Sequence, residues 1–229
     1  VLRDQALAVS GLLERKLEGP GVRPYQPSGL WKVVAVQGSN TQDFKQDSGD
    51  ALYRRSLYTF WKRTSPPPSM AAFDAPTREQ CTVRRARTNT PLQALVFMND
   101  PQYVEAARYL AQTALTLHTD ERARASMLLA EVLGRPPSET DLADVLPGAL
   151  EFHKIFKDRP EEAARLIETG DSTPLESCDK VELAAWTLVA NTLLKGWREV
   201  WDSSRSDPPA IGMLGSLSLI HISAPTRPR

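Results

Sequence analysis

The stretch from Cys81 to Tyr109, CTVRRARTNTPLQALVFMNDPQYVEAARY, is the part of the chain that decides how it folds. It predicts a basic turn followed by two consecutive helices. Asn89 or Thr90 can accept hydrogen bonds from the free amides of a first helical turn, and Pro91 suits the first helical position because its missing N–H costs nothing there. The pair Asp100-Pro101 repeats this arrangement further along. A capped break between two helices predicts a tight helical corner.

Apolar residues in both predicted helices recur at helical spacing. One face of the first helix carries Leu92, Leu95 and Val96. One face of the second helix carries Val104, Ala107, Ala111 and Leu115, and Tyr103 and Leu110 could widen it. A third apolar face lies in residues 183–194. Because a single domain buries such faces against each other, we expect the three to share one core.

The rest of the chain predicts further helices joined by long loops. Upstream of the corner we expect helices over residues 2–17 and 51–63, although the β-prone composition of the second also suits a strand. The prolines between residues 65 and 90 predict a long ordered loop. Downstream, helices are expected over residues 120–133, 138–157, 160–168 and 183–194, the second of them kinked or split at Pro147-Gly148. The expected fold class is mostly α, an irregular multi-helix domain with long ordered Pro-rich loops.

Several segments resemble a known family. They are VRPYQPSGLW (22–31), LYRRSLYTFWKRTSPPPSMAAFDAP (52–76), TVRRARTNTPLQALVFMNDPQYVEAAR (82–108), LGRPPSETDL (133–142) and ELAAWTLVANTLL (182–194). Together they are similar to the C-terminal domain of unknown function of large planctomycete proteins, which also carry a cytochrome-c-like domain and a second uncharacterised domain. The resemblance spans most of residues 1–194 and implies the C-terminal part of such a domain, with the other domains of the parent protein as partners. We expect this domain to be truncated at its N-terminus, because Val1 is not an initiator methionine. The resemblance implies no cofactor in this chain, with haem on a separate domain, and an extracytoplasmic location, because cytochrome-c-like domains mature outside the cytoplasm. It implies no biochemical role.

Residues 195–229 differ in character from the rest of the chain. Gly, Ser and Pro occur there in no amphipathic order, and the family pattern stops at Leu194. Residues 216–227, SLSLIHISAPTR, resemble a translated sequencing adapter. We expect 195–229 to be a non-homologous tail, disordered or artefactual, that packs outside the core; a native β-prone tail is the alternative.

The charge of the chain is balanced overall but unevenly distributed. Lys and Arg together number 28, as do Asp and Glu, which excludes nucleic-acid binding through overall charge. Residues 51–98 hold eight basic and two acidic side chains, whereas residues 99–185 hold nine and seventeen. We expect the basic segment to pair with the acidic helical half, with carboxylates of the chain holding Arg84 and Arg85. The alternative is a basic face for an external anion.

Metal, haem and membrane motifs are not found in the sequence. The histidines at 118, 153 and 221 are isolated, the CxxCH signature is missing, and no apolar run is long enough to span a membrane. Cys81 and Cys178 are too few for a disulfide scaffold, so we expect two inert thiols. The alternative for Cys81 is a reactive thiolate favoured by neighbouring arginines, and we expect it instead to be buried.

Two groups of side chains are candidate binding sites. The first is basic and comprises Arg78, Arg84, Arg85 and Arg87, with Asp74 and Glu79 nearby. Arginine forks bind carboxylate, sulfate or phosphate bidentately, so an anionic polysaccharide is a suitable ligand. The second is aromatic and comprises Tyr25 and Trp31, which could stack on a sugar. Both groups can instead be structural, as ion pairs and as core aromatics.

Two functions are compatible with these sites. The first is an accessory helical domain of a large extracytoplasmic protein, serving polysaccharide handling or surface assembly. The second is an enzyme domain, a hydrolase or lyase acting on anionic glycans, with Arg85, Asp74 and Glu79 near the chemistry.

Overall fold

In the computed structural model, residues 1–84 and 88–203 are described, and they are mostly helical, which confirms the expected fold class. The helices are α1 (Leu2–Ser10), α2 (Leu30–Val33), α3 (Pro68–Ala72), α4 (Pro91–Asn99), α5 (Pro101–Leu117), α6 (Glu121–Leu133), α7 (Glu139–Asp158), α8 (Pro160–Ile167) and α9 (Lys180–Ser203). Two short 3-10 helices, η1 (Gly49–Tyr53) and η2 (Ser56–Tyr58), lie between α2 and α3. None of the described helices is long and apolar enough to cross a membrane.

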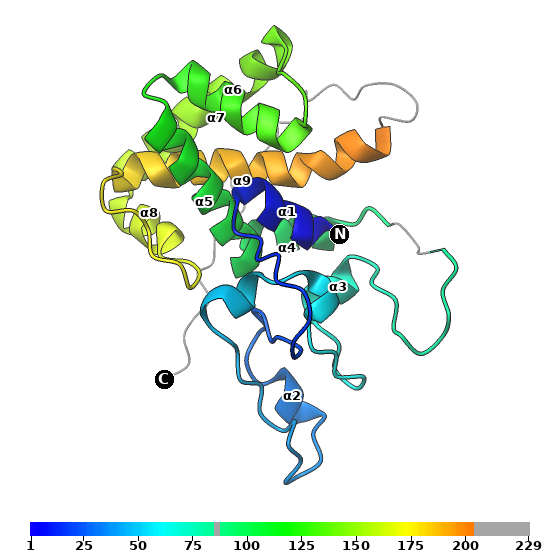
Figure 1. The fold of residues 1–229 in the computed structure, drawn as a ribbon. Helices are drawn as coiled ribbons and strands as arrows, with labels where there is room; N and C mark the ends of the chain where they lie inside the picture. Colours follow the sequence, from blue (N-terminus) through cyan, green and yellow to red (C-terminus); the bar gives the residue numbers. More distant parts are fainter. Residues whose placement is uncertain (85–87, 204–229) are drawn as a thin grey trace.

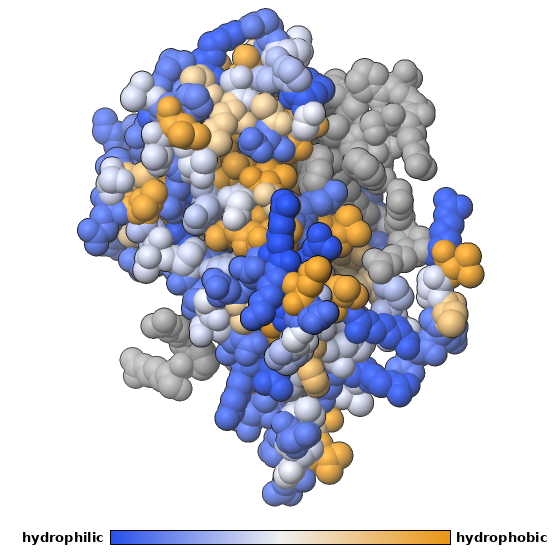
Figure 2. Space-filling view, in the orientation of Figure 1, coloured by the Kyte–Doolittle hydropathy of each residue, from blue (hydrophilic) through white to orange (hydrophobic). Residues whose placement is uncertain are grey.

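The core lies where α5 and α9 cross (Figure 1). Helices α7 and α8 pack on α9, α6 packs on α7, and α1 and α4 lie against α5. The segments that carry α2, α3, η1 and η2 form the lower part of the molecule in Figure 1. At its foot, the segment around α2 leaves Val33 and Val36 85% and 78% exposed, and Figure 2 shows hydrophobic groups gathered at this tip.

The predicted helical corner is confirmed. Thr90 and Gln93 form a capping box at the start of α4, and Pro91 is the first helical residue. At the start of α5, the side chain of Asp100 accepts a hydrogen bond from the backbone N–H of Gln102. These caps satisfy amides that a helix leaves without partners in its first turn.

The apolar face predicted for α5 is buried, whereas the one predicted for α4 is not. Val104 in α5 and Val189 in α9 are 5% and 4% exposed, but Leu92 and Leu95 of α4 are 58% and 42% exposed. Helix α4 instead buries the face that carries Gln93 and Phe97. The sharing of one core is therefore confirmed for α5 and α9 and wrong for the Leu92–Leu95 face.

Tertiary contacts explain which face α4 buries. The ring of Phe97 packs on Phe73 and Tyr103, at centroid distances of 5.1 and 4.4 Å. The buried amide of Asn191 in α9 donates to the Phe97 carbonyl at 3.1 Å, and Gln93 Nε2 donates to the Ala72 carbonyl at 2.8 Å. These partners come from distant parts of the chain, and they turn the leucines outward.

The helix predicted over residues 2–17 ends much earlier, at Ser10. Gly11 adopts a left-handed conformation with φ 83°, which terminates α1. The chain beyond it then pairs with a distant segment, since the N–H of Glu14 donates to the Tyr53 carbonyl at 3.1 Å. Leu17, at the end of the predicted helix, is 69% exposed.

The helix predicted over residues 51–63 is also wrong. The two 3-10 helices occupy its first part, and the backbone beyond them pairs with Val22. Val22 N donates to the Tyr58 carbonyl and Phe60 N donates to the Val22 carbonyl, both at 2.8 Å. An α-helix would place these groups within its own ladder, so the pairing excludes it. The loop expected over residues 65–90 contains the short helix α3.

Downstream elements match the sequence more closely. Asp120 caps α6, and Gly134 ends it with φ 66°. Helix α7 begins at a capping box of Ser138 and Asp141, and it continues through Pro147 without splitting. Helix α9 runs past its expected end at Leu194 to Ser203. Residues 204–229 lie outside the described part of the chain, so it stays a prediction that they pack outside the core.

Candidate functional site

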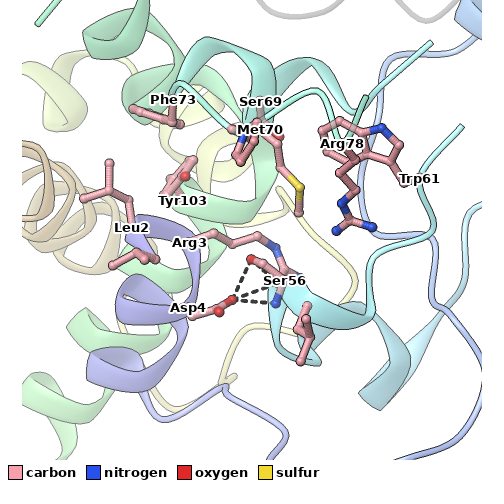
Figure 3. A pocket seen from close by; sticks show the side chains of 14 residues that line it. Leu2, Arg3, Asp4, Ser56, Trp61, Ser69, Met70, Phe73, Arg78 and Tyr103 are labelled. Carbon is pink, nitrogen blue, oxygen red and sulfur yellow. Dashed lines mark hydrogen bonds and ion pairs between the residues drawn. The ribbon is translucent and has the colours of Figure 1, made fainter. Parts of the chain in front are cut away.

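One of the predicted basic side chains, Arg78, lines a pocket of about 290 Å3 between α1, η2, α3 and α5 (Figure 3). Its guanidinium carbon lies 4.8 Å from the centroid of the Trp61 ring, and Trp61 lines the same pocket. Arg78 is an exposed residue whose backbone has φ 65°, a left-handed conformation that non-glycine residues seldom adopt. The stacking holds a cation at the mouth of the pocket.

The opposite wall of the pocket is built from α1 and η2. Asp4 Oδ1 accepts hydrogen bonds from the backbone N–H and the hydroxyl of Ser56, at 2.7 and 2.6 Å. The neighbouring Arg3 is 6% exposed, and it donates to the Arg54 carbonyl at 2.7 Å and to the Leu52 carbonyl at 2.6 Å. Burial lowers the pKa of Arg3, because the guanidinium has left water. Acceptors of the protein therefore engage Arg3, whereas Arg78 is the exposed arginine of this pocket.

An aromatic side chain forms the floor. Tyr103 is 2% exposed, and its ring contacts Phe73 and Phe97 at centroid distances of 5.9 and 4.4 Å. Burial raises the pKa of Tyr103, with the charge of Asp100 acting in the same direction. The hydroxyl therefore stays protonated at neutral pH.

The carboxylates of the predicted basic group are already occupied by the protein. Asp74 accepts from the backbone N–H and the hydroxyl of Thr88, both at 2.9 Å. Glu79 accepts from Arg63 Nε at 2.6 Å, and this hydrogen bond lowers the pKa of Glu79. Neither carboxylate lines the pocket that contains Arg78.

The remaining predicted arginines do not join Arg78. Arg84 is exposed, and the expected pairing with a carboxylate is not found for it among the described residues. Arg85 and Arg87 lie outside the described residues. Among the described residues, carboxylates of the acidic half (99–185) form ion pairs with arginines of the same half, as Glu182 does with Arg124. The expected pairing between the basic and acidic halves is therefore not found in this part of the chain.

The structure does not bring Tyr25 and Trp31 to a common surface. Trp31 is 2% exposed and packs on Phe44 and Phe60, at centroid distances of 5.0 and 5.6 Å, so it is a core aromatic. Tyr25 is half-buried, and its hydroxyl donates to Glu105 Oε2 at 2.8 Å. That contact leads to a polar cluster which the sequence analysis missed.

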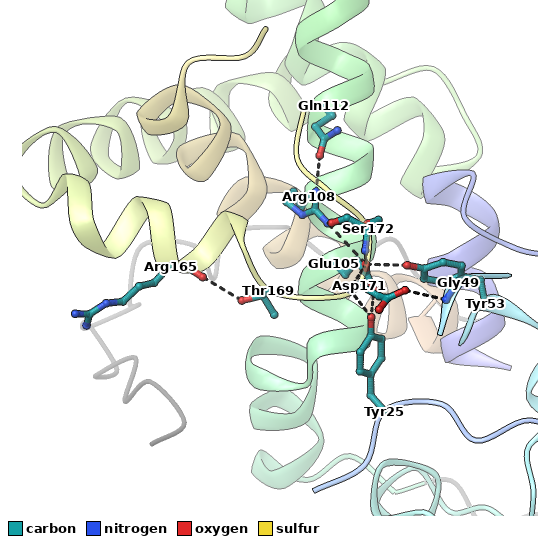
Figure 4. Close-up of polar contacts among 10 residues, drawn as sticks. All are labelled: Tyr25, Gly49, Tyr53, Glu105, Arg108, Gln112, Arg165, Thr169, Asp171 and Ser172. Carbon is teal, nitrogen blue, oxygen red and sulfur yellow. Dashed lines mark hydrogen bonds and ion pairs between the residues drawn. The ribbon is translucent and has the colours of Figure 1, made fainter. Parts of the chain in front are cut away.

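The centre of this cluster is a buried ion pair on α5, with Glu105 and Arg108 only 1% and 0% exposed (Figure 4). Arg108 Nη2 lies 3.7 Å from Glu105 Oε1. Glu105 Oε1 also accepts from the Tyr53 hydroxyl at 2.9 Å and from the backbone N–H and hydroxyl of Ser172, both at 2.7 Å. The carboxylate therefore joins the N-terminal segments to the loop that follows α8.

Two further features show how tightly this cluster is built. The backbone N–H of Asp171 donates to the Tyr25 hydroxyl at 2.7 Å and to Glu105 Oε1 at 2.9 Å. Gly170 has φ 104°, and a Cβ on it would lie 2.4 Å from Glu105 Cδ. The sequence signal for the cluster is a glutamate and an arginine at i, i+3 within the apolar stripe of VEAARYL, because charged groups on a buried face need partners.

Beside this cluster lies a second and larger cavity, of about 650 Å3. Three parts of the chain line this cavity: η1, the face of α5 from Tyr109 to Leu117, and the loop of residues 171–175. Tyr53, Gln112 and Ser172 connect the cavity to the buried ion pair.

The cysteines and potential metal ligands form no site in the described residues. Cys81 and Cys178 are free thiols there, and Cys81 is exposed, so the expectation that it is buried is wrong. No group of three or more His, Cys, Asp or Glu side chains in the described part could hold a metal ion.

Comparison with known proteins identifies a family without assigning an activity. No curated protein and no solved structure matches the chain significantly. The model of the family described as PSD1, protein of unknown function (DUF1553), matches residues 1–147, which include the Arg78 pocket and the Glu105–Arg108 ion pair. Since the match covers more than half of the 229 residues, the chain belongs to this family of proteins of unknown function.

Proposed function

We propose that the chain is a non-catalytic accessory domain that binds an anionic group of a polysaccharide at the Arg78 pocket. The observation that carries this proposal is the exposed guanidinium of Arg78, which is stacked on Trp61 at the mouth of a 290 Å3 pocket. A planar guanidinium donates two parallel hydrogen bonds to a carboxylate or sulfate. The stacking restricts its orientation, so less conformational entropy is lost when the anion binds.

The composition of the pocket supports a sugar that carries one anionic group. Met70 and Phe73 provide apolar surface, while Ser56 and Asp4 provide oxygens on the opposite wall. Asp4 is held by two hydrogen bonds from Ser56 and an ion pair with Arg3, which reduces its repulsion of an incoming anion. Apolar surface with a few fixed polar groups is typical of small-molecule sites.

The carboxylates favour binding over catalysis. A hydrolase or lyase needs a carboxyl group free to take or give a proton next to the substrate. Asp4, the carboxylate that lines the pocket, accepts two hydrogen bonds from Ser56 and pairs with Arg3. Outside the pocket, Asp74 is occupied by Thr88, and Glu79 is paired with Arg63 on the surface. These hydrogen bonds and ion pairs support an accessory binding domain over the alternative, an enzyme that acts on anionic glycans.

A titration with oligosaccharides tests this proposal. Sulfated and uronic-acid oligosaccharides are titrated into the chain by isothermal calorimetry, with turnover of the same ligands measured in parallel. Arg78→Ala removes the charge-assisted hydrogen bonds and should weaken binding about 10- to 100-fold. Arg55→Ala is the matched control, because Arg55 is an exposed arginine of the same segment outside the pocket. Equal affinities of Arg78→Ala and Arg55→Ala, or measurable turnover, would refute the proposal.

We also infer that the parent protein is extracytoplasmic and that any haem resides on a separate domain. The similarity of the chain to domains that accompany cytochrome-c-like domains supports this. Cell fractionation with haem staining of the full-length protein tests both points, and a cytoplasmic protein without haem contradicts them.

A further inference from the structure

We propose that the 650 Å3 cavity beside α5 is a second binding site, and that it takes an uncharged sugar residue. Its volume lies in the range of about 300–1,000 Å3 that is typical of ligand sites. The cavity shares no lining residue with the Arg78 pocket. The inference is therefore independent of the proposed function.

The lining of the cavity has the chemistry of a site for a neutral polyol. It contains no Lys or Arg, and its acidic side chain is Asp171. The other polar groups are neutral and belong to Tyr53, Tyr109, Gln112, Thr113, Thr116, Ser172 and Thr173. The hydroxyls of Tyr53, Thr113, Thr116 and Ser172 donate within the chain, so they offer acceptor oxygens to the hydroxyls of a sugar ring. A carboxylate without a neighbouring exposed cation disfavours an anionic ligand.

Gln112 provides an oriented donor to this cavity. The side chain is 4% exposed, and its Oε1 accepts from Arg108 Nη1 at 2.8 Å, which fixes the orientation of the amide (Figure 4). No hydrogen bond from Gln112 Nε2 is found within the described part of the chain, and this nitrogen is not one of the fully buried side-chain atoms that lack a partner. An amide whose oxygen is held and whose nitrogen has no partner among the described residues is a donor available to a ligand in the cavity.

Asp171 provides an oriented acceptor at the mouth of the cavity. Its backbone N–H is held by Tyr25 and Glu105, and its Oδ2 accepts from the backbone N–H of Gly49 at 2.8 Å. No donor among the described residues lies within hydrogen-bonding distance of Asp171 Oδ1. The buried ion pair therefore positions a carboxylate oxygen toward solvent, where a sugar hydroxyl can donate to it.

An aromatic ring completes the site. Tyr109 is 37% exposed, lines the cavity, and lies one helical turn before Thr113 on α5. Leu117 and Leu175, which also line it, are 64% and 47% exposed. The C–H face of a sugar ring packs on such surface, while its hydroxyls meet the polar groups.

NMR titration of the whole chain with neutral disaccharides tests the proposal. Cellobiose, maltose and lactose are each added to 15N-labelled protein, and the side-chain amide signals of Gln112 are followed after assignment with Gln112→Leu. At least one disaccharide should shift these signals in a saturable way. Tyr109→Ala should weaken binding about tenfold through loss of the stacking face, while Tyr109→Phe keeps the ring and stays within about twofold of the wild type. Asp171→Asn keeps an acceptor for Gly49 and should weaken binding about threefold to tenfold.

Several outcomes would overturn this inference. In the first, no disaccharide shifts the Gln112 signals. In the second, Tyr109→Ala leaves the disaccharide affinity unchanged. In the third, a leucine-rich peptide shifts the Gln112 signals and the disaccharides do not. Arg78→Ala should leave the neutral-sugar affinity unchanged. It separates the two sites, because a failure of the anion site would leave the Gln112 shifts intact.

Discussion

Replacing Glu105 by glutamine tests whether the buried ion pair on α5 holds the two parts of the fold together. The substitution keeps the shape of the side chain and removes its charge. Five hydrogen bonds reach the wild-type carboxylate, from Tyr25, Tyr53, Asp171 and Ser172, the last of these donating twice. After the change, one side-chain oxygen becomes an N–H donor, and Arg108 keeps its full burial without a counter-charge.

The expected loss of stability follows from these contacts. Removing one partner of a buried ion pair costs about 3–5 kcal/mol, because the other charge is left uncompensated. Arg108 retains hydrogen bonds to Gln112 and to Ser172 at 2.7–2.8 Å, which places the estimate at the lower end. We expect Glu105→Gln to lower the free energy of unfolding by about 3 kcal/mol, out of about 5–15 kcal/mol for a typical domain.

Urea denaturation followed by far-UV circular dichroism measures this loss. Glu151→Gln is the matched control, since Glu151 is an exposed glutamate of α7 and the same change there should cost at most about 0.5 kcal/mol. A loss below about 1 kcal/mol for Glu105→Gln would show that the cluster does not carry the stability assigned to it.

Three further predictions concern single side chains. Burial, reinforced by the charge of Glu105, raises the pKa of Tyr53 to about 12, from an ordinary value of 10.0. The unfolded chain then loses this proton first, so stability falls as the pH rises from about 10 to about 12, and urea midpoints across this range should fall less steeply in Tyr53→Phe. Gly170→Ala should lower the free energy of unfolding by about 2–4 kcal/mol, because the added Cβ would overlap Glu105. Gly134→Ala should lower it by about 1 kcal/mol, because Gly134 has φ 66° but open space around it. Equal melting temperatures of the two variants would contradict the overlap. Leu110→Ala, at a site 1% exposed, should cost about 2–5 kcal/mol in urea unfolding, and Leu95→Ala, at 42%, less than about 1 kcal/mol.

Local rules predicted the helical half well. The predicted caps at Thr90 and Asp100 are found, and α6, α7 and α8 lie close to the residues expected for helices. Each of these features depends on hydrogen bonds between residues at most a few positions apart, which is why sequence alone reveals them.

In the N-terminal third, the same local rules predicted the wrong helices, because backbone hydrogen bonds between distant segments determine the structure there. Residues 51–63 have the composition of a helix or a strand, but their backbone pairs with Glu14 and Val22. In α4, periodicity marked the leucines as buried, whereas contacts of Phe97 with Phe73 and Asn191 selected another face. Periodicity shows that a helix has an apolar face, and tertiary neighbours decide which face is covered.

The candidate sites divide in the same way. The sequence determined that Arg78 belongs to a basic segment with aromatic residues nearby, since charge and ring content can be counted directly. Only the tertiary structure decided that Arg78 stacks on Trp61 while Trp31 lies in the core. It alone also joined Glu105 to a tyrosine far upstream and a loop far downstream, because hydrogen bonds between distant segments exist only once the chain has closed around them.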